Sequence, residues 1–451
     1  MTTLTSHQRW QWRLLLLLIS LLALGFRYYY VIHAEVFQPV NQPNVRADAV
    51  EYYAYARNMV QHGVFSMAPE DVTPLAGDSF RDPGYPAFLA GWMKLFGQWD
   101  SWYSAVLLSQ ALLSALTVVF MLCLGRHWMP LRWLAVAGVL MAVWPHSVAM
   151  CSYLLSEILF GFLVALGLLL LSIALERRSA GWAVAGGIGL SAAALTNAIL
   201  LPVALLLALY LFVRRQMTLT MFAGLVIAAL AVTTPWAIRN SLLPPSDASS
   251  SGRAMANLVQ GSWPSYHSAY QAAMKHDPDG IVVMAAIDRE MAVIQSDPLT
   301  GLSLIGRRMA GSPGSYIRWY LSKPILLWGW NIRMGQGDVY VYPTRDSPFK
   351  VNPIYRAVEA ITHSLNPWLL VLALVGGLLA MLPGHQILPG IAATTLTLVF
   401  VTTVYSVLQA EPRYAIPFRG PEIMLAVFAA YQGVHAVARL RARIPARSAP
   451  I

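Results

Sequence analysis

The chain has 451 residues, of which 57% are hydrophobic and only 12% are charged, and its formal net charge is +10. A soluble globular protein carries about 25% charged residues, so this composition excludes a soluble globule and indicates a polytopic membrane protein. The positive charge is spread over many loops without a nucleic-acid-binding motif, which makes anionic membrane lipids better partners than nucleic acid. The two cysteines cannot form a disulfide framework or a cysteine-rich metal site.

Several apolar runs have the length, about 20 residues, of a helix that crosses a bilayer. The first run, residues 14–32, lacks a small-residue cleavage pattern, so we expect a first span and not a cleaved signal peptide. Residues 179–213 are too long for one span and predict a hairpin that turns near Thr196, and residues 360–409 predict a division at 383–385. The remaining expected spans are residues 101–125, 133–155, 158–175, 216–238 and 423–438, which makes about ten in all.

Arginines in the short loops and in both tails fall on one side of these spans, which predicts that this side is cytoplasmic. Two long segments, residues 33–100 and 239–357, then lie outside. The expected fold class is an all-α polytopic membrane protein with two large extracytoplasmic segments. We expect an N-terminal transmembrane module over residues 1–238, a large outer segment with interfacial helices over 239–357, and a C-terminal transmembrane module over 358–451.

Ionisable residues gather at the outer ends of the expected spans, where they are costly and tend to face a cavity. They are Asp48, Glu51, Arg81, Asp82, Glu157, Arg239 and Arg413. If Arg81, Arg239 and Arg413 converge at one membrane face, they suit a phosphate, because guanidinium groups bind it in bidentate fashion. Snorkelling to lipid headgroups is the alternative for each arginine taken alone.

Two acidic residues have a structural and a chemical interpretation. Asp48-Ala-Val-Glu51 has the spacing of a helix capping box, yet a capped carboxylate can still act as a general base. Glu157 is either a carboxylate favoured by a helix N-terminus or a second acid that orients substrate or pairs an arginine. The histidines have no metal-ligand spacing, and Asp48 with Glu157 gives little support for a divalent metal, so we expect no cofactor.

The motifs, taken in order from about residue 46 to residue 430, resemble the GT-C membrane glycosyltransferases, in particular the lipid A aminoarabinose transferases and protein O-mannosyltransferases. The matching pieces are Asp48 after the first span, then "RDPGYPAFLAG", "LLSEILFGFL", "ALTNAILLP", "TTPWAIRN" and "EPRYAIPF". The resemblance implies a GT-C-type fold and makes Asp48 the catalytic acid-base residue and Glu157 a second acidic site residue. It also makes Arg81 a contact of the donor phosphate and Arg239 a further basic residue, and we expect Arg413 to join them.

The resemblance further implies transfer of a sugar, with inversion, from a polyprenyl-phosphate donor such as an undecaprenyl phosphate sugar to a hydroxyl of a lipid, glycan or protein. The reaction would face the periplasm or exterior from a bacterial cytoplasmic (inner) membrane. Asp48-Ala49 and Asn197 depart from the patterns of these enzymes and leave the sugar and acceptor open. We expect further substrate-lining residues at Glu51, Tyr52, Asp82, Tyr85, Asn240 and Tyr414.

Two other functions are compatible with this sequence. A polysaccharide polymerase also has many spans and a large outer loop with arginines. A lipid-linked sugar transporter or flippase should place charged groups near the middle of its spans, whereas the expected spans here are nearly free of charge. That difference favours chemistry at the membrane surface over transport.

Overall fold

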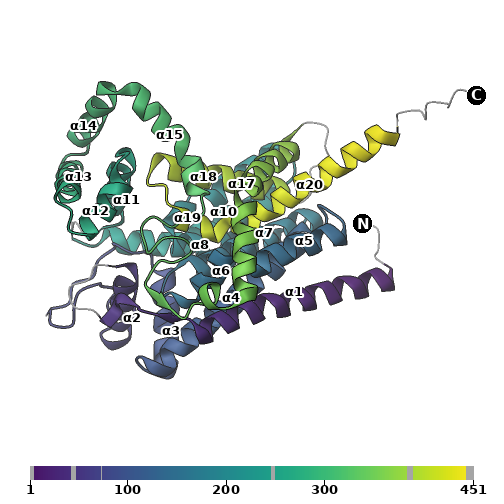
Figure 1. Cartoon of the computed structure of the whole chain (residues 1–451), viewed down its shortest axis with the longest axis horizontal. Coiled ribbons are helices and arrows are strands. Elements are labelled where there is room, and N and C mark those ends of the chain that lie inside the picture. The colour runs from purple at the N-terminus through teal and green to yellow at the C-terminus, as the bar shows by residue number, and fades with distance from the viewer. Residues whose placement is uncertain (1–4, 42–46, 73, 245–248, 383–389, 443–451) are drawn as a thin grey trace, which may run out of the picture.

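Long apolar helices lie side by side along the long axis of the molecule (Figure 1). The computed structural model describes residues 5–41, 47–72, 74–244, 249–382 and 390–442. Within these ranges, five helices are long and apolar enough to cross a membrane by length and composition. They are α1 (Ser6–His33), α4 (Asp100–Gly125), α7 (Glu157–Arg177), α10 (Leu219–Ser241) and α17 (Pro353–Met381). The chain is therefore built as a helical membrane protein.

The span expected over residues 133–155 is broken. Helix α5 (Leu131–Val143) and the short helix α6 (Pro145–Ala149), which continues into a 3-10 turn, meet at an angle of 49°. Pro145 lacks a backbone N–H and disfavours a helical conformation at the preceding residue, and Trp144 is accordingly extended. Counting the bent pair as one span gives up to six spans in the described part of the chain.

Shorter apolar helices account for much of the remaining hydrophobic sequence. Residues 179–213 divide at Asn197 into α8 (Ala180–Thr196) and α9 (Val203–Val213), next to the predicted turn at Thr196. A hairpin of two spans stays a prediction. The Asn197 side chain accepts a hydrogen bond from the Ile199 backbone N–H at 3.2 Å and so stabilises the turn. The expected division at 383–385 lies outside the described residues, and the total of about ten spans stays a prediction. The last two long helices are α18 (Ile391–Val407) and α20 (Arg419–Ala442).

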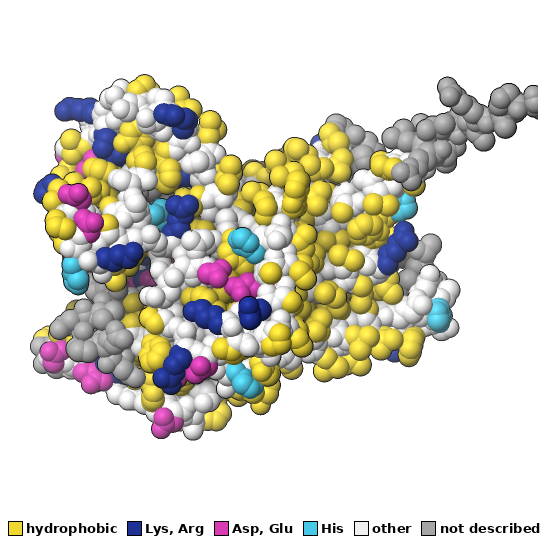
Figure 2. Space-filling model, viewed as in Figure 1, with side chains coloured by type: hydrophobic (Ala, Val, Ile, Leu, Met, Phe, Trp, Pro, Cys, Tyr) yellow, Lys and Arg dark blue, Asp and Glu magenta, His cyan; other side chains and the backbone are white. Residues whose placement is uncertain are grey.

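The polar elements gather at one end of the bundle, opposite the start of α1 and the end of α20 (Figure 1). Charged side chains concentrate at that end, while hydrophobic side chains cover most of the bundle (Figure 2). The helices there are α2 (Asp48–Gln61), α3 (Gly84–Phe96), α11 (Ser250–Ser262), α12 (Tyr266–Met274), α13 (Pro278–Ser296), α14 (Pro298–Gly311) and α15 (Pro313–Leu327). These helices belong to residues 33–100 and 239–357, for which we keep the name outer segments. Their extracytoplasmic side and the three module boundaries stay predictions.

Short elements tie the two outer segments together. Strand β1 (Glu35–Val36) pairs antiparallel with β2 (Thr344–Arg345), and Glu35 lies opposite Arg345. The sheet therefore brings the chain after α15 beside the chain after α1. The other short elements are α16 (Pro348–Val351), α19 (Pro412–Ala415) and 3-10 turns at Pro39–Asn41, Met150–Ser152, Ala198–Leu200 and Ile416–Phe418.

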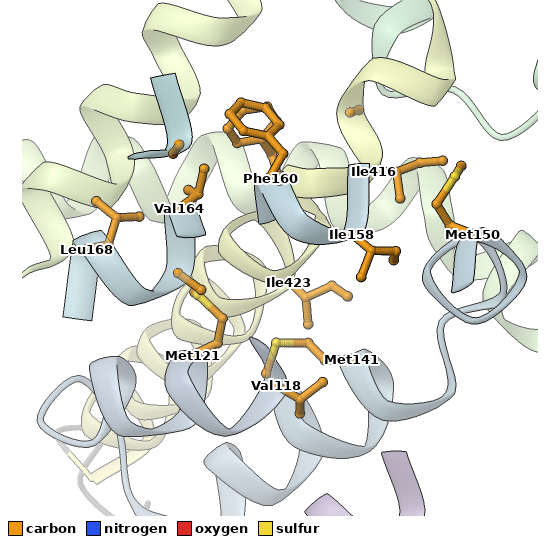
Figure 3. Packing of buried hydrophobic residues seen from close by; sticks show 14 of the residues in the cluster. Val118, Met121, Met141, Met150, Ile158, Phe160, Val164, Leu168, Ile416 and Ile423 are labelled. Carbon is orange, nitrogen blue, oxygen red and sulfur yellow. The ribbon is translucent and has the colours of Figure 1, made fainter. Parts of the chain in front are cut away.

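The bundle core interlocks α4, α5, α7 and α20. Met121, Met141 and Ile423 face one another between these helices (Figure 3). Charged residues are also buried in this region, among them Arg27 of α1, which is 1% exposed. Its guanidinium donates to Ser114 Oγ at 2.7 Å and to three backbone carbonyls, among them that of Ala142 at 2.6 Å. These bonds satisfy the buried charge and tie α1 to α4 and α5.

Close packing of α17 on α20 depends on Gly376. A Cβ atom at this position would lie 2.1 Å from the Leu425 carbonyl oxygen, a backbone atom that cannot turn away. We expect Gly376→Ala to lower the free energy of unfolding by about 2 kcal/mol and to lower the Tm in detergent, because the two helices must separate. Gly25→Ala is the matched control, since a Cβ there meets nothing within 4 Å. Equal Tm values for the two variants would contradict this interpretation of the helix contact.

Candidate active site

Asp48 is the first residue of α2, but its carboxylate does not cap the helix. The N-cap is Ala47, and no side chain makes a capping hydrogen bond there. The capping-box interpretation of Asp48 and Glu51 is therefore wrong. Both carboxylates instead turn to arginine side chains, because a charge-assisted bond to a guanidinium group is stronger than a bond to a neutral N–H.

Two arginines from distant parts of the chain meet at Asp48. Arg81, in the turn before α3, places Nη2 2.5 Å from Asp48 Oδ1, and Arg413 of α19 places Nη2 2.6 Å from Asp48 Oδ2. The Asp48 side chain is 29% exposed, against 13% for Arg81 and 12% for Arg413. Burial by itself would raise the pKa of the Asp48 carboxyl, but the two guanidinium charges outweigh it and lower this pKa.

Each arginine is held by a second carboxylate on its other edge. Arg81 Nε and Nη2 lie 2.6 and 2.5 Å from Glu51 Oε2, and Arg413 Nε donates to Glu157 Oε1. These five residues form a continuous set of ion pairs, which we call the Asp48 cluster. It contains three carboxylates and two guanidinium groups, so it carries one net negative charge when all five are ionised.

Glu157 also faces the interior of the bundle. Its Oε2 atom is buried and has no hydrogen-bond partner among the described residues. Glu157 lines a small cavity of about 40 Å³ together with Arg27 and Arg419. A cavity of this size with charged groups in its wall can hold ordered water, which would satisfy the second oxygen. Glu157 thus starts α7 and joins the Asp48 cluster to the buried polar groups below it.

Tyrosines surround the cluster on several sides. The Arg81 guanidinium lies 5.1 Å from the centre of the Tyr52 ring, and the Tyr52 hydroxyl donates to Ser156 Oγ at 3.2 Å. Tyr85 packs edge-on against Tyr52, with ring centres 5.0 Å apart. The Ala49 backbone N–H donates to the Tyr342 hydroxyl at 3.4 Å. Tyr342 was not among the predicted residues, because only the pairing of β1 with β2 brings its loop to this site.

The structure does not bring Arg239 into the cluster. Its guanidinium donates to the backbone carbonyls of Asp78, at 2.5 Å, and Phe65, at 3.2 Å, and stacks on Trp236. The predicted convergence of three arginines is therefore wrong for Arg239 in this structure. Arg239 instead holds the first outer segment against the end of α10.

Two other predicted residues also lie outside the cluster. Asp82 Oδ2 pairs with Arg253 Nη2 at 2.8 Å and accepts from the Ala198 backbone N–H at 3.1 Å. It therefore joins the outer segments to the turn between α8 and α9, and Arg253 is a partner that sequence reasoning missed. Tyr414 stacks on Tyr405, with ring centres 5.0 Å apart. Its neighbour in the chain, Arg413, enters the cluster.

Two surface hollows meet at the outer end of α10. An open apolar groove of about 780 Å³ is lined by Pro235, Ile238 and Leu242 with the single charged residue Arg239. A polar pocket of about 850 Å³ follows, lined by Asn240 with hydroxyl and amide side chains of both outer segments. Leu243 borders both hollows, so an apolar surface and a polar surface adjoin there.

The described residues contain no group of three or more His, Cys, Asp or Glu side chains that could hold a metal ion. The arrangement offers instead a carboxylate beside two guanidinium groups. Such a constellation can exchange a proton and can bind an oxyanion.

Comparisons with known proteins show likeness at the level of structure. No protein-family model and no curated protein sequence matches the chain. The apo oligosaccharyltransferase of Archaeoglobus fulgidus superposes with a TM-score of 0.51 at 13% identity, over 98% of this chain and 53% of that one. Archaeal AglB from the same organism, in complex with an inhibitory peptide and a dolichol-phosphate, gives 0.51 at 14% identity, with the same coverage.

ArnT from Cupriavidus metallidurans bound to undecaprenyl phosphate matches with a TM-score of 0.37 at 16% identity, over 96% of this chain and 81% of that one. The chain spans about half the length of the oligosaccharyltransferase structures. The shared architecture covers almost the whole of this chain. The chain therefore has the fold of the GT-C membrane glycosyltransferases.

Proposed function

We propose that the protein is a membrane glycosyltransferase that moves a sugar from a polyprenyl-phosphate donor to an acceptor hydroxyl. The observation that carries the proposal is the contact of one carboxylate, Asp48, with the guanidinium groups of Arg81 and Arg413 at the polar end of an apolar helix bundle. The fold supports it, because one structural neighbour is in complex with a dolichol-phosphate.

In the proposed reaction the acceptor oxygen attacks the anomeric carbon of the donor from the face opposite the phosphate. Asp48 takes the hydroxyl proton, the new carbon–oxygen bond forms, and the bond from the anomeric carbon to the phosphate oxygen breaks with inversion. Polyprenyl phosphate leaves with the bonding electrons. Arg81 and Arg413 stabilise the negative charge that grows on the phosphate oxygens.

The groove on α10 suits the prenyl tail of the donor. It is open and almost entirely apolar, and it lies at the outer end of a span, so a tail can enter from the surrounding lipid. Arg239 lies at this groove and not at Asp48, so its proposed role is to hold the outer segment and the tail region. The active site would face the periplasm or exterior from a bacterial inner membrane.

The direct experiment is transfer by the purified protein in nanodiscs. The protein is incubated with a panel of polyprenyl-phosphate sugars labelled in the sugar, and with lipid, glycan and protein fractions of a cell envelope as acceptors. Release of polyprenyl phosphate together with a labelled product of inverted anomeric configuration supports the proposal. No release from any donor, by protein that remains folded, contradicts it.

The pH profile of catalytic efficiency gives a separate prediction. Because the pKa of Asp48 lies below its ordinary value near 3.8, the carboxylate stays ionised throughout neutral and mildly acidic solution. kcat/KM reports groups of the free enzyme, so we expect no loss of kcat/KM from this residue between about pH 7 and pH 5. A steady-state profile in that range checks this. An acid limb near pH 6 that shifts in Asp48→Glu would contradict it.

A further inference from the structure

The guanidinium groups of Arg81 and Arg413, which we propose hold the donor phosphate, already bind an anion of the protein, the Asp48 carboxylate. Arg81 Nη2 contacts one oxygen of Asp48, and Arg413 Nη2 contacts the other, at 2.5 and 2.6 Å. The carboxylate therefore bridges two guanidinium groups in the way that two oxygens of a phosphate would. We call the paired Nη2 groups of Arg81 and Arg413 the two-arginine seat.

The three carboxylates of the Asp48 cluster differ in how firmly they are held. Glu51 contacts both Nε and Nη2 of Arg81, Glu157 contacts Nε of Arg413, and their side chains are 17% and 7% exposed. Asp48 contacts only the Nη2 groups and is 29% exposed, the most of the three. Glu51 and Glu157 thus fix the arginines in place, whereas Asp48 is the anion nearest to solvent and can be replaced.

Charge balance opposes a second anion beside Asp48. The cluster holds three carboxylates against two guanidinium groups, and a phosphodiester would add a further negative charge. Like charges within a few ångströms, in a site that is mostly buried, repel strongly. A phosphate therefore binds to the two-arginine seat most favourably if the Asp48 carboxylate leaves the seat.

We infer that Asp48 occupies the two-arginine seat until a donor binds, and that the donor phosphate displaces it. This inference rests on the proposed function and adds a regulatory step to the same site. A carboxylate bound by two guanidinium groups is a weak base, as the lowered pKa of Asp48 reflects. Once displaced, the same carboxylate loses both positive partners and becomes a stronger base. The base is thus activated only when the donor is in place.

Displacement predicts that removal of the Asp48 charge improves binding of the lipid phosphate. We expect Asp48→Asn to lower the Kd of undecaprenyl phosphate about tenfold, because the variant loses the anion that bridges both arginines of the seat. The measurement is a titration of radiolabelled undecaprenyl phosphate against the protein in nanodiscs of zwitterionic lipid. Asp71→Asn is the matched control, since it makes the same change on an exposed residue of the same outer segment.

A Kd for Asp48→Asn equal to or higher than that of the wild type overturns the inference. A tenfold decrease that also appears in Asp71→Asn overturns it too, because the effect would then be one of net charge. The tightening must also depend on the seat. In an Arg81→Gln background, we expect Asp48→Asn to change the Kd by less than about threefold.

A second measurement uses the wild-type protein, so its result does not depend on whether a variant folds correctly. Infrared difference spectra with carbon-13-labelled aspartate report the carboxylate stretch of aspartates on addition of undecaprenyl phosphate. Displacement predicts a shift of one aspartate band, which undecaprenol without phosphate does not cause. An unchanged aspartate spectrum at saturation overturns the inference.

These outcomes are separable from those of the proposed function. Binding of undecaprenyl phosphate needs no sugar transfer. If Asp48→Asn tightens binding but the wild type transfers no sugar, the displacement stands and the glycosyltransferase proposal fails. If the wild type transfers sugar but Asp48→Asn binds no tighter, the displacement fails alone.

Discussion

Asp48→Asn is expected to lower kcat for sugar transfer about 10³-fold, because the variant cannot take the proton of the acceptor hydroxyl. The substitution preserves the size of the side chain and an oxygen that can accept from Arg81 or Arg413. Loss of turnover should therefore come without loss of the donor. Single-turnover rates at saturating donor, with release of polyprenyl phosphate as the readout, separate the chemical step from binding.

Asp71→Asn provides the comparison for this rate as well, and we expect it to retain wild-type turnover because Asp71 is exposed. Asp48→Glu keeps a carboxylate but moves it, so partial activity is expected from it. If Asp48→Asn kept more than a tenth of the wild-type rate, Asp48 would not be the base.

Arg413→Gln is the second change with a large expected effect. Arg413 contacts both Asp48 and Glu157, so its loss leaves three carboxylates and a single guanidinium group in the Asp48 cluster. We expect kcat/KM to fall about 10²-fold, because charge on the departing phosphate loses a stabilising partner. We also expect the free energy of unfolding to fall by about 3 kcal/mol, because Glu157 is 7% exposed and would lose its ion pair with Arg413.

Arg345→Gln is the control for Arg413→Gln. It tests whether loss of any arginine in the outer segments lowers kcat/KM and the free energy of unfolding. Arg345 is 65% exposed and pairs with Glu35, which is 50% exposed, so its removal should cost less than about 1 kcal/mol. Arg413→Lys keeps the positive charge but not the guanidinium group, which can contact two carboxylates through different edges. Compared with Arg413→Gln, we expect Arg413→Lys to restore more of the free energy of unfolding than of kcat/KM. If Arg413→Gln unfolds at the same denaturant concentration as Arg345→Gln and transfers sugar at the wild-type rate, Arg413 has neither role.

Much of the helical framework could be predicted from sequence. Runs such as those that became α4, α7 and α10 are apolar over a full membrane thickness, and the division at Asn197 follows from a run that is too long for one span. The break before Pro145 could have been predicted from the proline itself, but an uninterrupted apolar run masked it.

The candidate site could be predicted only in part. Asp48, Arg81, Glu157 and Arg413 lie at the outer ends of spans, and the structure brings all four together. Arg239, near the end of α10, bonds instead to backbone carbonyls. The sequence cannot distinguish these five residues. It indicates that each lies near the end of a span, but it does not show which way each side chain points.

The sequence by itself determined that this chain is a helical membrane protein with its ionisable residues at one face. The reason is local: a run of about 20 apolar residues has enough transfer free energy to place a helix in lipid, whatever follows it. Only the tertiary structure decided which charges pair. An ion pair depends on a few ångströms between groups such as Asp48 and Arg413, which are 365 positions apart in the chain. That distance is set by how α2, α7 and α19 pack, and no local pattern contains it.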